Sequence, residues 1–316
     1  MSERSYSRID QIWRDNHHVT IIYPDGSQLC RLPVLYLEKS GTNDWKLVQD
    51  IVQALITEPI AVFEENGSEL QDMSGIPVSG QYTVRHRDPT SRSEELTPKL
   101  GPEGNTRYYP LDDTARSSKS GSSRSTSRQN NFRLALNSRD AKCVVTGHPW
   151  MSCIASHIVP FSRLDVYQRI YIPGISENNL FEPCMGVLLD DAFSRMFDRF
   201  SWSIYWRQGR YYFHGPAMDP DYDEYHGKKL KIGGKEIWHP RLMPLPELCQ
   251  WHWEQCMMAH ARGFAVWPTM EALSQEQQPS VHQSISTIQR GGKTATNRRT
   301  SARGSSVKQT RKRVKG

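Results

Sequence analysis

The segment that most constrains the fold of this chain is residues 112–131, DDTARSSKSGSSRSTSRQNN, which contains almost no apolar side chain. Such a segment cannot bury enough apolar surface to offset the conformational entropy that ordering it would cost. A second stretch of this kind, rich in Gln, Ser, Thr, Arg and Lys, begins near residue 274. We therefore predict that the apolar residues fold in two blocks, one before the first segment and one between the two.

The two polar stretches divide the chain into four predicted parts. They are a small α+β N-terminal module (1–90), a Ser/Arg-rich linker (91–131), a folded domain with a C-terminal helix (132–270) and a disordered basic tail (271–316). A length of 316 residues suits about two domains. The overall class that these blocks predict is α+β.

The N-terminal module carries fold signals and no chemical motif. Residues 18–35 alternate in polarity around Asp25-Gly26, a pair that favours a hairpin turn. Residues 43–56, NDWKLVQDIVQALI, place apolar side chains on one face of a predicted helix. We expect this module to serve packing or interaction rather than catalysis.

The positive charge of the chain is concentrated in the tail. The net charge is +6, yet ten of the 40 basic residues follow Glu276, and the remainder carries 30 basic against 34 acidic residues, a net charge of −4. A basic tail attracts phosphate groups through long-range attraction and counterion release. Two clusters in it suit a bipartite nuclear import signal or nonspecific nucleic-acid contacts, and they comprise Arg298, Arg299, Arg311, Lys312, Arg313 and Lys315.

The cysteines and the N-terminus indicate a reducing compartment. The six cysteines form no Cys-x-x-Cys pair, and the first residues, MSERSYSRIDQIWR, lack the apolar core of a signal peptide. No apolar run approaches the ~18 residues that cross a bilayer. We expect free thiols, no membrane partner, no secretion and a nuclear location, with the cytoplasm as the alternative.

Residues 132–215 contain the residues that point to chemistry. A short helical pattern starts at Phe132, and a β-branched run, Val144 to Thr146, predicts a strand. A second run, Cys153 to Val159, contains His157. After a loop, GVLLDDAFSRMFDRFSWSIY predicts a strand (186–189), a helix (about 190–197) and a strand (202–205).

Four fragments of this block, RDAKCVVTG, ASHIVPFS, GVLLDDAFSRMFD and FSWSIY, together resemble the HNH endonuclease family in its fungal-type form. PELCQWHWEQC further along is similar to the Trp-His-containing C-terminal helix of fungal members. The resemblance covers about residues 132–260. It implies a ββα-metal core, metal-dependent hydrolysis of phosphodiester bonds, and nucleic acid as partner, DNA rather than RNA.

In that family a hairpin histidine takes a proton from water, and His157 matches its position. A neutral imidazole can accept this proton near pH 7 without a shifted pKa. The resemblance implies that the ring projects toward the helix near residue 190, beside a cavity open to water. It also implies that a backbone carbonyl or a side chain orients the ring through its other nitrogen.

Two positions depart from the family pattern. Met185 stands where the family has Asn, and Ser194 stands where the family has its metal-binding His. Asp190 and Asp191 lie close to Ser194 in sequence and supply carboxylates, which Mg²⁺ or Mn²⁺ prefers. We predict a metal site at Asp190, Asp191 and Ser194 if the chain is active. The alternative role of the two aspartates is to cap the helix.

Zinc is a second possibility for the metal. Cys143 and Cys153, joined by His148 or Cys184, could bind zinc. However, the Cys-x-x-Cys motif that zinc-binding HNH proteins use is missing.

The helix predicted over residues 246–262 carries another set of possible ligands, Cys249, His252 and Cys256. We expect packing there instead, with a buried side marked by Leu248, Trp251, Gln255/Cys256 and Ala259.

The sequence thus predicts an HNH-type nuclease-domain protein with a histidine general base and a divalent metal. The alternative, which Met185 and Ser194 motivate, is a catalytically inactive HNH fold that binds nucleic acid or protein. In either case the basic tail would contact nucleic acid or an import receptor.

Overall fold

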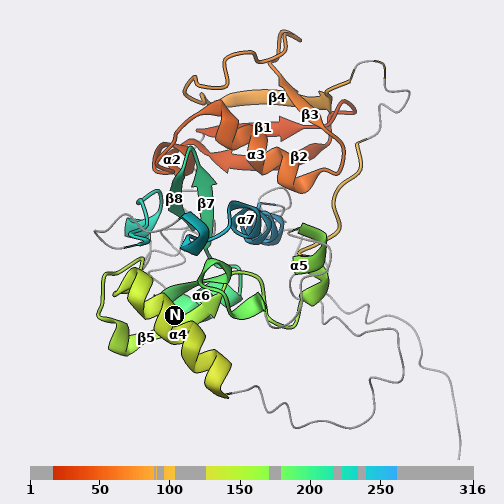
Figure 1. Ribbon diagram of the computed structural model, residues 1–316. Coiled ribbons are helices and arrows are strands. Elements are labelled where there is room, and N and C mark those ends of the chain that lie inside the picture. The colour runs from red at the N-terminus through yellow and green to blue at the C-terminus, as the bar shows by residue number, and fades with distance from the viewer. Residues whose placement is uncertain are drawn as a thin grey trace, which may run out of the picture. The chain divides into compact units, whose positions relative to one another are not determined.

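The chain divides into two units, residues 1–267 and 268–316. The computed structural model (Figure 1) describes residues 17–88, 90, 96–103, 126–170, 179–215, 223–233 and 240–261. All of these lie in the first unit, and their mixture of helices and strands confirms the α+β class. The six tail residues predicted to contact nucleic acid or an import receptor lie outside the described residues.

A four-stranded sheet forms the N-terminal part. Its strands, β1 (His18–Ile22), β2 (Gln28–Pro33), β3 (Ile60–Phe63) and β4 (Gly80–His86), lie in the order β2-β1-β4-β3. The central pair β1 and β4 is parallel, and the two outer pairs are antiparallel. The predicted hairpin between β1 and β2 is confirmed, with Gly26 at φ 85° in its turn.

Helix α3 (Trp45–Leu55) packs against this sheet (Figure 1). The Asp44 side chain caps it by accepting a hydrogen bond from Leu47 N at 3.0 Å. Its apolar face, which includes Leu47 and Ile51, is fully buried, as the sequence pattern predicts. A short helix, α2 (Val34–Glu38), follows β2.

The remaining elements follow residue 126. The helices and strands are α4 (Thr126–Asp140), β5 (Cys153–His157), α5 (Leu164–Ile170), β6 (Gly186–Asp190), α6 (Asp191–Asp198), β7 (Ser203–Arg207), β8 (Arg210–His214) and α7 (Pro246–His260). Short 3-10 turns are η3 (Trp150–Ser152), η4 (Asn179–Phe181), η5 (Pro183–Met185), η6 (Asp223–Tyr225) and η7 (Pro240–Leu242).

Two strands and a helix make up the centre of this part. Strands β5 and β6 pair antiparallel, from Cys153 opposite Asp190 to His157 opposite Gly186. Helix α6 begins at the residue after β6 and contacts both strands. The strand predicted at Val144–Thr146 is wrong: these residues form a turn that Gly147 N closes on Cys143 O at 2.9 Å. The partner of β5 is therefore β6, which lies beyond a long loop.

Helix α4 differs from its prediction in where it begins. It starts at Thr126, inside the segment predicted as linker, rather than at Phe132. Within the same predicted linker, Leu96 is buried and Pro98 forms a β-bridge with Ile56. A polar segment can therefore carry ordered residues when a few apolar side chains reach the core.

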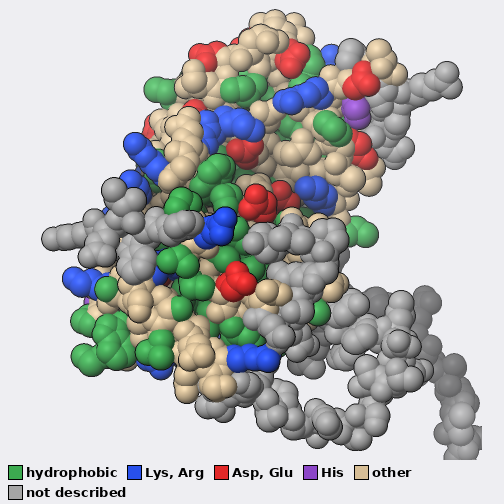
Figure 2. Space-filling view, viewed as in Figure 1, with side chains coloured by type: hydrophobic (Ala, Val, Ile, Leu, Met, Phe, Trp, Pro, Cys, Tyr) green, Lys and Arg blue, Asp and Glu red, His purple; other side chains and the backbone are tan. Residues whose placement is uncertain are grey.

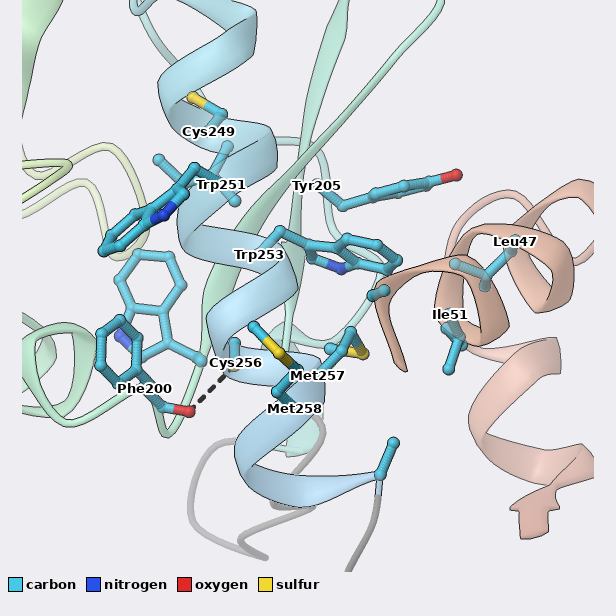
Figure 3. Close-up of a cluster of buried hydrophobic side chains, with 14 of the residues drawn as sticks. Leu47, Ile51, Phe200, Tyr205, Cys249, Trp251, Trp253, Cys256, Met257 and Met258 are labelled. Carbon is cyan, nitrogen blue, oxygen red and sulfur yellow. Dashed lines mark hydrogen bonds between the residues drawn. The ribbon is translucent and has the colours of Figure 1, made fainter. Parts of the chain in front are cut away.

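Helix α7 is a central helix rather than a surface one (Figure 3). Trp253, Cys256 and Met257 on it are buried, and it contacts both α3 and β7. The predicted buried side is correct for Leu248, Trp251 and Cys256 but wrong for Ala259, which is exposed near the end of the helix. A helix that packs against neighbours on several sides lacks the single apolar stripe of a surface helix.

Partly buried polar contacts join the N-terminal part to the hairpin of β7 and β8. Tyr205 Oη donates to Asp50 Oδ2 at 2.8 Å, and Arg207 pairs with Asp44 at 2.7 Å. The chain also approaches itself closely at a glycine, because a Cβ on Gly227 would lie 1.8 Å from the carbonyl oxygen of Lys39. Apart from these polar contacts, most of the buried apolar residues of the first unit form one continuous core.

No helix in the described ranges combines the length and the hydropathy of a bilayer-spanning segment.

Candidate functional site

Ser156 faces helix α6 from strand β5. Its hydroxyl lies 2.8 Å from the hydroxyl of Ser194, and both side chains are buried. Each hydroxyl therefore satisfies the other in a region where water cannot do so. Ser194 is the predicted metal ligand, and the structure brings it to Ser156 rather than to Asp190 or Asp191.

His157 lies on the other side of the strand, because neighbouring residues of a β-strand point to opposite faces. Its ring stacks on Phe132 of α4, with the ring centres 4.5 Å apart and an angle of 20° between the planes. Its Nε2 lies 3.0 Å from the carbonyl oxygen of Leu180. The ring thus packs on α4, which differs from the expected direction toward α6, whereas a backbone carbonyl does hold one of its nitrogens as expected.

Asp190 lies at the opposite end of the β5–β6 ladder from His157. It pairs with Cys153, four positions before His157, and four steps along a strand span roughly 13 Å. Its Oδ1 accepts a hydrogen bond from Phe193 N at 3.1 Å, and its Oδ2 accepts one from Thr146 Oγ1 at 3.0 Å. Asp190 therefore acts as the N-cap of α6.

Asp191 is exposed in the first turn of α6 and forms an ion pair with Arg195, one turn further on. His148 Nδ1 lies 3.4 Å from Asp190 Oδ2, and the His148 side chain is exposed. The alternative that the sequence left open, in which the two aspartates cap the helix, therefore describes their position at the start of α6. The structure does not bring them together with His157.

The described residues do not fit the predicted divalent cation. Mg²⁺ and Mn²⁺ take several oxygen ligands, mostly carboxylates and water. Across the described ranges, no three His, Cys, Asp or Glu side chains are grouped so that they could hold a metal ion. The two serines that lie between hairpin and helix offer only neutral hydroxyls that already bond to each other.

The first zinc alternative meets the same difficulty. Cys143 Sγ accepts a hydrogen bond from Asp190 N at 3.3 Å, and Cys153 Sγ donates to Pro149 O at 3.4 Å. Burial raises the pKa of Cys184 to about 11, which opposes the thiolate form that binds zinc.

The ligand set on α7 is also occupied by internal contacts. His252 Nδ1 lies 2.7 Å from Ser203 Oγ, and its Nε2 lies 3.2 Å from Phe197 O. Cys256 Sγ donates to Phe200 O at 2.9 Å (Figure 3). These side chains pack the helix against its neighbours, as expected.

Met185, at the family's Asn position, is fully buried. Its backbone carbonyl accepts a hydrogen bond from Ile158 N at 2.9 Å, directly beside the start of β6. A thioether in this position fills the core and offers no polar group to a substrate.

One charged pair near the site was not assigned a role from the sequence. The buried guanidinium of Arg139 pairs with Asp140 at 2.7 Å and donates to the carbonyl oxygens of Pro183, Gly186 and Leu242. Asp140 in turn accepts hydrogen bonds from Leu188 N and Gly233 N. The pair fixes the start of β6, opposite His157. The sequence signal for it is the adjacent Arg-Asp pair that opens the fragment RDAKCVVTG.

A pocket of about 390 Å³ opens beside His157. Its wall includes Phe132, Phe161 and Phe181, and Asn130 and Arg133 of α4 also line it. Sequence reasoning missed this pocket, because its three phenylalanines are far apart along the chain and two of them lie in loops or short turns.

The model of the HNH endonuclease family matches residues 143–205. The match spans β5, β6 and α6, and it leaves out the N-terminal sheet, α4 and α7. No curated protein and no solved structure matches the chain. The family match indicates a nuclease-type function and nucleic acid as the class of partner. Residues 143–205 of the chain are therefore similar to the HNH endonuclease family.

Proposed function

We propose that the chain binds nucleic acid through its HNH-family domain and does not cleave it by the metal-dependent reaction of active members. The observation that carries this proposal is the hydrogen bond between Ser156 and Ser194, 2.8 Å long and buried between β5 and α6. In the family resemblance, the Ser194 position belongs to the metal-binding histidine. Here it holds a neutral hydroxyl that already has its partner.

A cation at this position would be unfavourable for two reasons. It would have to break the Ser156–Ser194 hydrogen bond, and it would bring a charge into a buried region where neither serine offers a negative ligand. Burying a charge without a compensating partner costs several kcal/mol or more. The carboxylate of Asp190, the N-cap of α6, is already engaged by Phe193 N and Thr146 Oγ1.

The basic tail supports binding rather than cleavage. Ten Lys and Arg residues after Glu276 can release counterions from phosphates, whereas the rest of the chain has a net charge of −4. Affinity should therefore fall steeply with salt. The clusters Arg298-Arg299 and Arg311–Lys315 also motivate import into the nucleus, where such a ligand is abundant.

A second candidate function is hydrolysis with His157 as general base, and one contact favours it. In the neutral imidazole, a donor at Nε2 facing Leu180 O leaves Nδ1 as the acceptor nitrogen. A ring held in this way is oriented for taking a proton.

The experiment offers the full-length protein plasmid, single-stranded DNA and RNA, with Mg²⁺ or Mn²⁺ present, and measures both binding and cleavage. We expect binding that weakens with salt, and the same uncut substrate from the wild type and from His157→Ala. If the wild type cleaves a substrate and His157→Ala does not, the proposal is wrong and the second candidate function takes its place. No binding of any nucleic acid at low salt would overturn both.

A further inference from the structure

We propose that the preferred ligand is single-stranded nucleic acid, and that one unpaired base inserts into the pocket beside His157. This inference rests on the proposed nucleic-acid binding and specifies which form is bound and where. The pocket, called the aromatic pocket below, is lined by Asn130, Phe132, Arg133, His157, Phe161 and Phe181, among others. Its wall on α4 lies outside the residues that match the family model.

The aromatic pocket is built from four rings that hold one another in place. Phe132 stacks on His157 with the ring centres 4.5 Å apart. The ring centres of Phe161 and Phe181 lie 5.7 and 5.8 Å from that of His157, in edge-to-face arrangements. Phe161 and Phe181 lie 5.3 Å apart and are only partly buried. Partly exposed ring surface in a preformed pocket is what a base needs for stacking, and it does not depend on which base is offered.

The rim of the aromatic pocket on α4 is polar and suits a nucleotide. Gln129 and Arg133 are one turn apart on the helix, and Asn130 lies beside them, all with exposed side chains. The amide groups of Gln and Asn can both donate to and accept from the edge of a base. Arg133 reaches the hairpin, where it donates to Cys153 O at 3.3 Å, and its charge lies where a phosphate would leave the pocket.

Charge separates the aromatic pocket from two other cavities on the described surface. A pocket of about 560 Å³ between α5 and α7 has three glutamates, Glu103, Glu247 and Glu254, against two basic side chains, Lys99 and Arg169. One of about 500 Å³ beside α6 includes Asp190, Asp191 and Glu224. None of the described residues that line the aromatic pocket is acidic. A phosphate backbone is repelled by carboxylates, so this cavity accepts a nucleic acid where the others oppose it.

Apolar side chains continue the surface beyond the aromatic pocket. Ile154 lines it and is 41% exposed, and Trp150 and Met151, just before β5, are 46% and 73% exposed. Figure 2 shows hydrophobic side chains gathered over the part of the molecule where Figure 1 labels β5 and α4. Bases in a duplex are already stacked and paired, so only an unpaired strand gains from such a surface.

The test measures binding by fluorescence anisotropy with full-length protein and three labelled ligands of equal length. These are a single-stranded oligothymidine, a duplex, and a strand of abasic sites that has the same phosphates but no bases. We expect the oligothymidine to bind more tightly than the other two. Phe181→Ala should weaken its binding by about 10-fold and leave the abasic strand unchanged. Phe63→Ala, at a partly buried phenylalanine on β3, is the matched control and should change neither.

A second variant keeps the test interpretable if Phe181→Ala does not fold. Gln129→Glu with Asn130→Asp adds two negative charges to the exposed rim without touching the packed rings, and it should also weaken binding of the oligothymidine. Gln81→Glu, at an exposed site on β4, controls for charge alone. If both pocket variants bind the oligothymidine as the wild type does, the pocket is not the site, while nucleic-acid binding stands. If the wild type binds no strand at low salt, the proposed function itself fails.

Discussion

At the scale of single residues, the family motif contains two kinds of residue: those that stabilise the fold and those at positions where catalysis would take place. Arg139 and Asp140 belong to the first kind, because the pair is buried and bonds to backbone atoms from five other residues. Ser156, Met185 and Ser194 are close to where chemistry would occur, and their side chains are buried and engaged internally. The domain therefore keeps the residues that maintain its shape, whereas a serine, Ser194, stands where the family pattern has its metal-binding histidine.

The residue-scale prediction concerns Arg139. Arg139→Ala leaves the Asp140 carboxylate buried without its charged partner, and it removes the hydrogen bonds that the guanidinium donates to three carbonyl groups. We expect the free energy of unfolding to fall by roughly 3–5 kcal/mol, measured by urea denaturation. The exposed Lys142→Ala should stay within about 0.5 kcal/mol of the wild type. A loss below 1 kcal/mol for Arg139→Ala would show that the pair does not hold β6 in place.

At the scale of elements, the sequence predicts β6, α6 and β7 to within one or two residues, because their apolar patterns and the Asp190 cap are local signals. The prediction from sequence fails at Val144–Thr146, where β-branched residues form a turn. The backbone N–H of Val144 donates to Leu188 O, but this hydrogen bond is not part of a β-ladder. Tertiary contacts override strand propensity here. The aromatic pocket could not be predicted from the sequence either, because its rings meet only when η4 and α4 are in place.

The element-scale prediction tests the contact between β5 and α6. Ser194→Ala leaves the Ser156 hydroxyl buried without a partner, and we expect it to lower the free energy of unfolding by about 1–3 kcal/mol. The double variant Ser156→Ala with Ser194→Ala should lose less than the sum of the two single variants, because neither hydroxyl is then left unpaired. Additive losses in a denaturation cycle would show that the two hydroxyls are not coupled.

At the scale of the whole molecule, histidines fix the N-terminal part to the β7–β8 hairpin. His226 Nε2 lies 2.9 Å from Tyr36 O, and His214 Nε2 lies 3.0 Å from Ser40 O. Burial lowers the pKa of His226 to about 4 and that of His214 well below its usual value. Both rings are therefore neutral in the folded protein, and neither a sequence pattern nor a motif could have indicated this role.

The whole-molecule prediction follows from this pKa difference. Below about pH 6.5 the unfolded chain binds protons at these imidazoles and the folded chain does not, so the free energy of unfolding falls as the pH falls from 6.5 to about 4. His226 alone accounts for roughly 3 kcal/mol of this loss at the acid end. His226→Gln should flatten the dependence of urea midpoints on pH, whereas His17→Gln, at an exposed position, should not. The same slope in His226→Gln as in the wild type would contradict the assignment.

The most direct test of the central claim is a calorimetric titration of the full-length protein with Mn²⁺. If the hydroxyl pair of Ser156 and Ser194 stands in place of a metal site, the wild type gives no saturable heat and behaves as the Ser194→Ala variant does. One bound ion per chain, lost when Asp190→Asn or His157→Ala is introduced, would contradict the account and restore metal-dependent cleavage as the function of this domain.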